Sequence, residues 1–258
     1  MKYIELLRDE GVVEILLNRP PVNALNKELI EELREAFHDV EACSQDRVVI
    51  IRSLTRAFVA GADIKMMETF HQLQQVREMV HYVKDLQQLY DQLEAMSKPT
   101  IAYIEGHALG GGLELAMSCD FRVMNRQVAK VGLPEVKLGL IPGAGGTQRL
   151  TRLIGETKAK ELIYFSKQWN ADEAYQHGLV SSVVNGREDV LEIASQLANQ
   201  SLSAIVSVKR CIQTASEQTH SLGSERELTE TLNAFSSEDA RIGMEAFLTK
   251  KAPEFMSK

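Results

Sequence analysis

The sequence predicts an α/β fold with a helical C-terminal region, and three observations support that prediction. Strand-like and helix-like patterns alternate over roughly the first 190 residues. The run Val48-Val49-Ile50-Ile51 is continuously apolar, as in a strand that is covered on both faces. From about Asp189 onwards only helical patterns occur. Since alternating strands and helices are typical of the α/β class, we expect a mixed core over residues 1–195 and a helical region over residues 196–258.

The first predicted strand is Val12–Leu17, and it ends before Pro20-Pro21 because two adjacent prolines cannot continue a central strand. Asn26 is expected to cap a helix that runs to about Cys43. The apolar residues of this helix recur at spacings that place them on one face: Leu29, Ile30, Leu33, Phe37 and Val40.

The apolar run at Val48–Ile51 is the next predicted strand. After it, the small residues of Phe58–Ile64 predict a loop that leads into a helix, and a polar helical stretch covers Leu73–Met96. The elements that follow are, in order, a strand at Thr100–Ile104, a glycine-rich turn at Gly106–Gly112, a helix to about Cys119, a strand at Phe121–Val123, a loop region between Pro134 and Pro142, and a helix, turn and strand within Ala171–Val184.

Composition excludes several classes of function. The 258 residues are 44% hydrophobic and 25% charged, which is typical of a soluble globular protein. The formal charge of −7 disfavours broad nucleic-acid binding, which needs a basic face. Three widely spaced cysteines predict neither a disulfide framework nor a zinc site. No apolar run reaches the ~20 residues that span a bilayer. We therefore expect a cytoplasmic protein, or an organellar one after removal of a transit peptide, without nucleic-acid or membrane partners.

Common catalytic and metal-binding signatures are absent. The sequence has no P-loop, no His-Glu-x-x-His, no Cys-x-x-Cys and no Gly-x-Ser-x-Gly. The six histidines do not cluster, so no metal site is expected. Only His107, beside the second glycine-rich turn, is a candidate for contact with a ligand.

Two segments are candidates for presenting free backbone amides. Ala60-Gly61-Ala62-Asp63-Ile64-Lys65 leads into a predicted helix, whose first N–H groups lack partners within the helix. Gly110-Gly111-Gly112 directly precedes another helix and lets the backbone come close to a ligand. Such donors stabilise a carbonyl oxygen that gains negative charge. Taken alone, the first segment is better explained by the tight packing of a turn under a helix.

Two glutamates complete a candidate catalytic set. Glu114 has apolar neighbours on its helix, so we expect it to be buried with a partner or with a shifted pKa. Glu135 lies in an apolar stretch, although pairing with Lys137 or Arg149 is an alternative role. Addition of water across an activated double bond needs donors for an enolate-like oxygen. It also needs groups that deprotonate the water and deliver a proton to the α carbon, which two carboxylates can share.

These residues resemble the enoyl-CoA hydratase/isomerase (crotonase) family. Each matching segment is weak alone, but their order and spacing together are specific. The resemblance covers nearly the whole chain, in the segments Leu17-Asn18-Arg19-Pro20 with Asn23-Ala24-Leu25-Asn26, Phe58–Lys65, Ala108–Asp120, Gly132–Leu150, Ala171–Val184 and Gly243–Phe255. It implies a crotonase-like spiral of ββα turns with a C-terminal helical trimerisation region, often assembled as a dimer of trimers.

The resemblance also implies roles for individual residues. Ala62 and Gly111 match the two oxyanion-hole amides, and Glu114 and Glu135 match the hydratase pair. Gly143 matches a glycine whose amide steadies the second glutamate. The implied reaction is the reversible hydration of a trans-2-enoyl-CoA to a 3-hydroxyacyl-CoA. It requires no metal or redox cofactor, because CoA arrives as part of the thioester substrate.

Further matches concern CoA. Ala24, Ala60, Asp63 and Ile64 fall where the family's backbone lines the path of the adenine and pantetheine. Two residues near the C-terminus match a pair that serves CoA bound in a neighbouring subunit: Phe247 and Lys250. The stretch Met66–Met96 resembles the family's variable region and is expected to form part of the wall of the acyl pocket.

Two departures from the family's pattern bear on these roles. Twenty residues separate Glu114 from Glu135, one more than the resemblance leads us to expect. We assign the surplus to the turn Met124–Lys130, because a turn tolerates an extra residue; a surplus near Leu133 would displace Glu135. Pro21-Val22 stands where many relatives carry a basic residue near the CoA phosphates.

Two other functions compete with hydration. A double-bond isomerase of the same family often keeps only one of the two glutamates. A non-catalytic acyl-CoA or RNA-binding scaffold would tolerate the loss of either glutamate, and an RNA binder should carry a basic patch. Both carboxylates are present and the chain is acidic, so hydration is the favoured function. The sequence does not predict the acyl-chain length.

Overall fold

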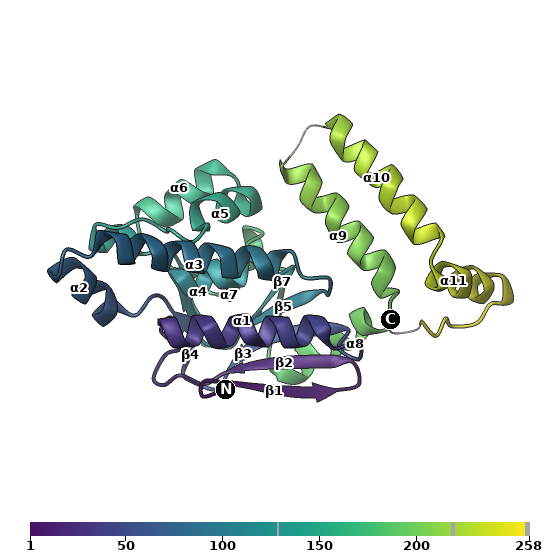
Figure 1. The fold of residues 1–258 in the computed structure, drawn as a ribbon, viewed down its shortest axis with the longest axis horizontal. Coiled ribbons are helices and arrows are strands. Elements are labelled where there is room, and N and C mark those ends of the chain that lie inside the picture. The colour runs from purple at the N-terminus through teal and green to yellow at the C-terminus, as the bar shows by residue number, and fades with distance from the viewer. Residues whose placement is uncertain (128, 218–219, 256–258) are drawn as a thin grey trace.

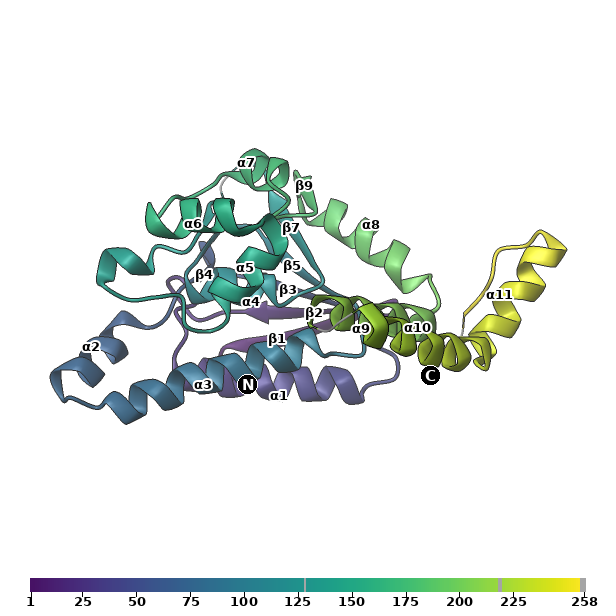
Figure 2. The same ribbon diagram turned by 90° about the horizontal axis from the view of Figure 1, so that it is seen from above.

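Two β-sheets form the centre of the fold (Figures 1 and 2). The computed structural model describes residues 1–127, 129–217 and 220–255. The strand order is β1-β2-β3-β5-β7-β9 in the larger sheet and β4-β6-β8 in the smaller one. The strands are Ile4–Asp9 (β1), Val12–Leu17 (β2), Val48–Ser53 (β3), Ala57–Ala60 (β4), Thr100–Ile104 (β5), His107–Leu109 (β6), Phe121–Asn125 (β7), Val131–Gly132 (β8) and Ser182–Val184 (β9).

Helices surround these sheets and continue beyond them. Their bounds are Lys27–Ala42 (α1), Ile64–Gln72 (α2), Val76–Glu94 (α3), Gly111–Met117 (α4), the 3-10 helix Glu135–Leu138 (η1), Gly146–Ile154 (α5), Glu156–Tyr164 (α6), Ala171–Gln176 (α7), Arg187–Ala198 (α8), Leu202–Glu217 (α9), His220–Phe235 (α10) and Glu238–Thr249 (α11). Among the described residues, none of these helices combines the length and apolarity needed to cross a bilayer.

The chain winds as a spiral of ββα turns, as the resemblance implied. After the antiparallel hairpin β1–β2, every strand pair is parallel. Each of three successive turns contributes one strand to the larger sheet, one to the smaller sheet and then helix: β3, β4 and α2–α3; β5, β6 and α4; β7, β8 and η1–α5. The loops that follow β4, β6 and β8 therefore lie at the same end of one parallel sheet, and this brings distant segments together.

The predicted signals of α1 and the central strands are confirmed. The side chain of Asn26 accepts a hydrogen bond of 3.0 Å from the amide of Leu29 and so caps α1. All five apolar residues predicted for one face of α1 are buried. The run Val48–Ile51 is buried within β3, between β2 and β5.

Some strands differ from the prediction. β1 was not predicted, and the segments of β4 and β6 were predicted as a loop and a turn. These two strands hold only four and three residues, too few for a periodic signal. The glycines of the predicted turn meet a packing demand: a β carbon on Gly112 of α4 would lie 2.0 Å from the carbonyl oxygen of Val59 in β4. Small residues here indicate a helix pressed against a strand.

The C-terminal helices extend away from the body of the molecule (Figures 1 and 2). The predicted boundary at residue 195 falls within α8, which packs on β2 and β3, whereas α9 and α10 pack side by side beyond it. Lys209 on α9 pairs with Asp120 at 2.9 Å and so ties the helix pair to the core. Large apolar side chains of α9–α11 are exposed in the single chain: Val208, Ile212, Leu222, Leu228, Leu232, Phe235, Met244, Phe247 and Leu248.

Candidate active site

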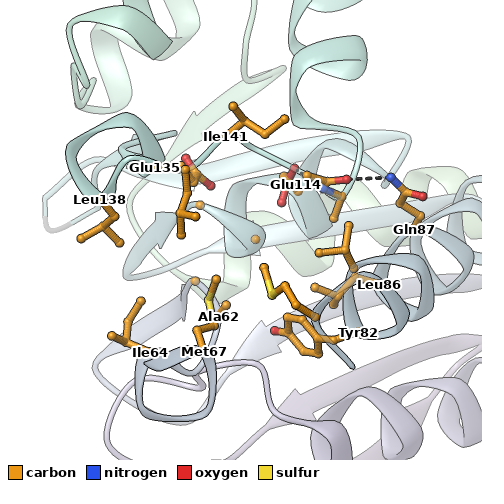
Figure 3. A pocket seen from close by; sticks show the side chains of 18 of the residues that line it. Ala62, Ile64, Met67, Tyr82, Leu86, Gln87, Glu114, Glu135, Leu138 and Ile141 are labelled. Carbon is orange, nitrogen blue, oxygen red and sulfur yellow. Dashed lines mark hydrogen bonds between the residues drawn. The ribbon is translucent and has the colours of Figure 1, made fainter. Parts of the chain in front are cut away.

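A cavity of about 720 Å³ lies where the ends of the small sheet, η1 and α3 meet (Figure 3). Its size is typical of a small-molecule site. Seven of the predicted site residues line it: Ala60, Ala62, Ile64, Gly111, Glu114, Glu135 and Gly143. The side chains of Glu114 and Glu135 lie on one side, and Tyr82 and Leu86 face the cavity from α3 (Figure 3).

The remaining predicted residues lie outside the cavity wall. The carbonyl of Ala24 and the carboxylate of Asp63 accept hydrogen bonds of 2.7 and 2.8 Å from Arg19, close to the turn at Ala62. Phe247, on α11, and Lys250, which caps it, do not line the cavity of their own chain. His107 does not line it either: its ring is exposed and accepts a hydrogen bond from the amide of Lys130.

The amide of Ala62 is free for a different reason from the one predicted. Two amides at the start of α2, those of Lys65 and Met66, are not free, because the carboxylate of Asp63 caps them. Leu25 instead forms a parallel bridge with Ala62. In this bridge the carbonyl of Gly61 and the amide of Asp63 bond to Leu25, each at 2.9 Å. Among the described residues, the amide of Ala62 itself has no acceptor, and it lies at the cavity wall.

The second turn brings Gly111 to the same place. Gly110 has a φ of +53°, which favours glycine, and a β carbon on it would lie 2.9 Å from Oε1 of Glu135. Gly111 is the first residue of α4, so its amide has no partner in the helix, and no other described residue accepts from it. A β carbon on Gly111 would lie 2.9 Å from Cδ1 of Leu25, the residue that bridges Ala62. The two turns therefore pack directly against each other.

Glu114 is buried and held by two amides. Its side chain is on α4 and the residue is 3% exposed. Its Oε1 accepts hydrogen bonds of 2.8 Å from the amides of both Ala144 and Gly146. Burial raises the pKa of Glu114, while the two amides and the charge of Arg149 oppose that rise. The prediction of a buried carboxylate with partners and a shifted pKa is confirmed.

Glu135 lines the same cavity, but no hydrogen bond holds one of its carboxylate oxygens. It begins η1, and its Oε2 is buried without a hydrogen-bond partner. Burial raises its pKa to about 7, and the nearby charge of Glu114 adds to the rise. Neither Lys137 nor Arg149 forms an ion pair with it among the described residues, so the alternative structural role is wrong: Arg149 pairs with two acids of α3. The two amides favour the ionised form of Glu114, whereas Glu135 exchanges its proton near neutral pH.

The prediction for Gly143 needs correction. Its amide does not reach Glu135; the amides that steady a glutamate belong to the next residues of the same turn, and they hold Glu114. The carbonyl of Gly143 accepts a hydrogen bond of 2.7 Å from Gln87 instead. The surplus residue before Glu135 has not displaced it from the cavity. Residue 128 of the turn Met124–Lys130 lies outside the described residues.

Helix α3 forms part of the cavity wall, as predicted, and it also supports both turns, which was not predicted. Met79, Tyr82, Val83 and Leu86 line the cavity, which confirms the wall. In addition, the hydroxyl of Tyr82 donates to the carbonyl of Leu25 at 3.0 Å, beneath the first turn. The hydroxyl of Tyr90 donates to the carbonyl of Gly111 at 2.7 Å, beneath the second. The helical spacing of these tyrosines with Leu86 and Leu93 was the available signal.

Comparison with known proteins gives a consistent result. The family described as "Enoyl-CoA hydratase/isomerase" matches residues 8–258. The probable enoyl-CoA hydratase 2, mitochondrial, of Arabidopsis thaliana is 40% identical over 95% of this chain and 81% of its own. The crotonyl-CoA hydratase of Syntrophomonas wolfei is 39% identical over 99% and 98% of the two chains. The crystal structure of an enoyl-CoA hydratase from Bacillus anthracis has a TM-score of 0.92 and 36% identity, covering 99% of this chain and 100% of that one. The chain belongs to the enoyl-CoA hydratase/isomerase (crotonase) family.

Proposed function

We propose that the chain catalyses the reversible hydration of a trans-2-enoyl-CoA to a 3-hydroxyacyl-CoA. The observation that carries this proposal is the contrast between the two glutamates of one cavity. Glu114 is held by two amides that favour its ionised form, whereas Glu135 has an unpartnered buried oxygen and a pKa of about 7. A pair of carboxylates in different protonation states can act as base and acid in one reaction.

In this mechanism the thioester oxygen lies between the amides of Ala62 and Gly111. Glu114 removes a proton from water, and the oxygen of that water bonds to the β carbon. The π electrons move towards the carbonyl, whose oxygen gains charge that the two amides stabilise. Glu135 then delivers its proton to the α carbon, and the thioester re-forms. Dehydration runs the same steps backwards, with the two glutamates exchanging protonation states.

The remaining surfaces fit the same substrate class. Ala24, Ala60, Asp63 and Ile64 would line the path of the CoA portion, and the apolar wall of α3 would face the acyl chain. The proposed chemistry uses no metal or redox cofactor, because CoA enters as part of the substrate. The free cysteines are compatible with the reducing cytoplasm, where we place the reaction.

We further propose that the chain works as a trimer or a dimer of trimers. Exposed apolar side chains on α9–α11 support this, since clusters of this kind are usually covered in a soluble protein. Closed symmetry is the usual outcome for such a protein. Residues 196–258 would then serve assembly, and residues 1–195 would serve catalysis. Phe247, which is 84% exposed, and Lys250 would contact CoA in a neighbouring subunit.

The test is the loss of the enoyl-thioester absorbance when crotonyl-CoA is added, with chromatographic identification of the product. Formation of 3-hydroxybutyryl-CoA supports hydration. Interconversion of 2-enoyl-CoA and 3-enoyl-CoA without hydroxylated product would replace hydration by isomerisation. No turnover with any member of a panel of chain lengths would contradict both functions.

A further inference from the structure

The turn that holds Glu114 is itself built around a buried guanidinium. Arg149 of α5 is 7% exposed, and its Nη1 donates to the carbonyl of Ala144 at 3.1 Å. Gly145 has a φ of +99°, and a β carbon on it would lie 2.1 Å from the same Nη1. The turn therefore wraps closely over the guanidinium, and only glycine fits at its centre.

Helix α3 fixes the guanidinium from the other side. Nε of Arg149 donates to Glu94 at 2.9 Å, and Nη2 donates to Asp91 at 2.7 Å. Gln87, on the same face of α3, donates to the carbonyl of Gly143 at 2.7 Å. Helix α3 therefore holds the start of the turn by a direct hydrogen bond, and it holds the middle of the turn through Arg149.

The other face of the turn meets the carboxylate. Arg149 bonds to the carbonyl of Ala144, in the middle of the turn. The amides of Ala144 and Gly146 both donate to Oε1 of Glu114 at 2.8 Å. A β carbon on Gly146 would lie 2.7 Å from that oxygen, so the fit is close. Any shift of the turn would move both donors together.

We propose that Arg149 is a positioning residue for the base: braced by Asp91 and Glu94, it holds the Ala144–Gly146 turn so that Glu114 stays ionised and aimed into the cavity. The expected effect of Arg149 on turnover rests on the proposed hydration. Its expected effect on the position and ionisation of Glu114 does not. Glu114 and Arg149 do not touch, so the effect passes through the turn and through the field of the guanidinium.

The groups that face Glu114 come from three elements. Arg149 of α5 lowers its pKa, against burial, which raises it. Glu135 of η1 is the second acid of the cavity, and its pKa is itself raised by burial and by Glu114. Tyr82 and Tyr90 of α3 are neutral, because burial raises the pKa of both hydroxyls. Loss of the guanidinium should therefore let the pKa of Glu114 rise.

The test compares Arg149→Met and Arg149→Lys with Arg152→Met as control. Arg152 is on the same helix and 3.8 Å from the same Glu94, but its side chain is 43% exposed, and it donates no hydrogen bond to the turn. We expect Arg149→Met to lower kcat on the order of 10²-fold, since displaced catalytic groups cost about that much. In Arg149→Met, the acid limb of the pH profile of kcat/KM should move to higher pH. Arg149→Lys keeps the charge without the forked bonds, so it should lose kcat while its acid limb stays near that of the wild type.

A second readout needs no turnover. Infrared titration of the free protein, with Glu114→Gln to assign the band, reports the protonated carboxyl of Glu114 directly. We expect this band to persist to higher pH in Arg149→Met than in wild type and in Arg152→Met. An unshifted band and an unshifted acid limb in Arg149→Met would overturn the proposal and leave Arg149 a purely structural residue. If Arg149→Met does not fold, an Arg149→Lys enzyme with full kcat overturns it. If the wild type hydrates no enoyl-CoA, hydration fails while the infrared shift still decides the role of Arg149.

Discussion

Replacing Glu135 by glutamine should abolish hydration and yet stabilise the protein above neutral pH. The pKa of this carboxyl is about 7 in the folded chain, against an ordinary value of 4.5. At about 1.4 kcal/mol for each tenfold change in acidity, this difference amounts to about 3 kcal/mol. Because Glu135 is only half-buried and solvent screens it, we expect Glu135→Gln to raise the free energy of unfolding by about 1–3 kcal/mol.

The pH range of this effect follows from the sign of the pKa change. Below pH 4.5 the carboxyl is protonated in both states and costs nothing. Between 4.5 and about 7 the unfolded chain releases the proton and the folded chain keeps it, so the wild type loses stability as pH rises. Above about 7 the loss is complete. The glutamine in Glu135→Gln does not titrate, so this variant does not lose stability over that pH range.

Thermal unfolding at a series of pH values measures the effect at a fixed protein concentration. For a chain of this size the stabilisation corresponds to a rise in Tm of about 2–6 °C near pH 8, which should vanish towards pH 4.5. Glu192→Gln, at an exposed position of α8, removes a carboxylate outside the cavity and controls for net charge. A Tm difference between Glu135→Gln and wild type that stays constant across this pH range would refute the claim that burial raises the pKa of Glu135.

The remaining predictions concern catalysis and assembly. Glu114→Gln should cut hydration of crotonyl-CoA by about 10²–10⁴-fold with the fold intact, and near-full activity would exclude it as the base. In the wild type, kcat/KM for hydration should fall as pH rises above about 7, where Glu135 loses its proton; a profile flat to pH 9 would contradict its role as the acid. Gly111→Pro should lower kcat by about 10²–10³-fold, whereas Gly111→Ala adds a β carbon in the same place and keeps the N–H. Equal kcat in these two variants would mean that the amide is not a donor to substrate. Light scattering should give three or six subunits, and Lys250→Ala should weaken binding of the CoA ester less at high salt than at low salt, without changing the mass; a fully active monomer would contradict both expectations.

The sequence by itself determined the elements that carry strong local signals. The period of α1, its cap at Asn26 and the apolar strands follow from side chains that must be buried within their own segment. The same reasoning marked Glu114, because a carboxylate among apolar neighbours must find partners. The resemblance supplied the spiral of ββα turns and the family, which no periodicity in the chain could indicate.

Only the tertiary structure decided which distant groups meet. Glu114 finds its partners 30 and 32 positions away, at Ala144 and Gly146, because successive turns of the spiral end at one edge of the small sheet. The free amide of Ala62 depends on a bridge to Leu25, and the support of the glutamate turn depends on Arg149. Such contacts leave no local pattern, since a hydrogen bond between segments far apart in the chain constrains neither segment's own periodicity. The sequence therefore identified the reacting groups, and the contacts of α3 and α5 with the glutamate turn determined how they are held.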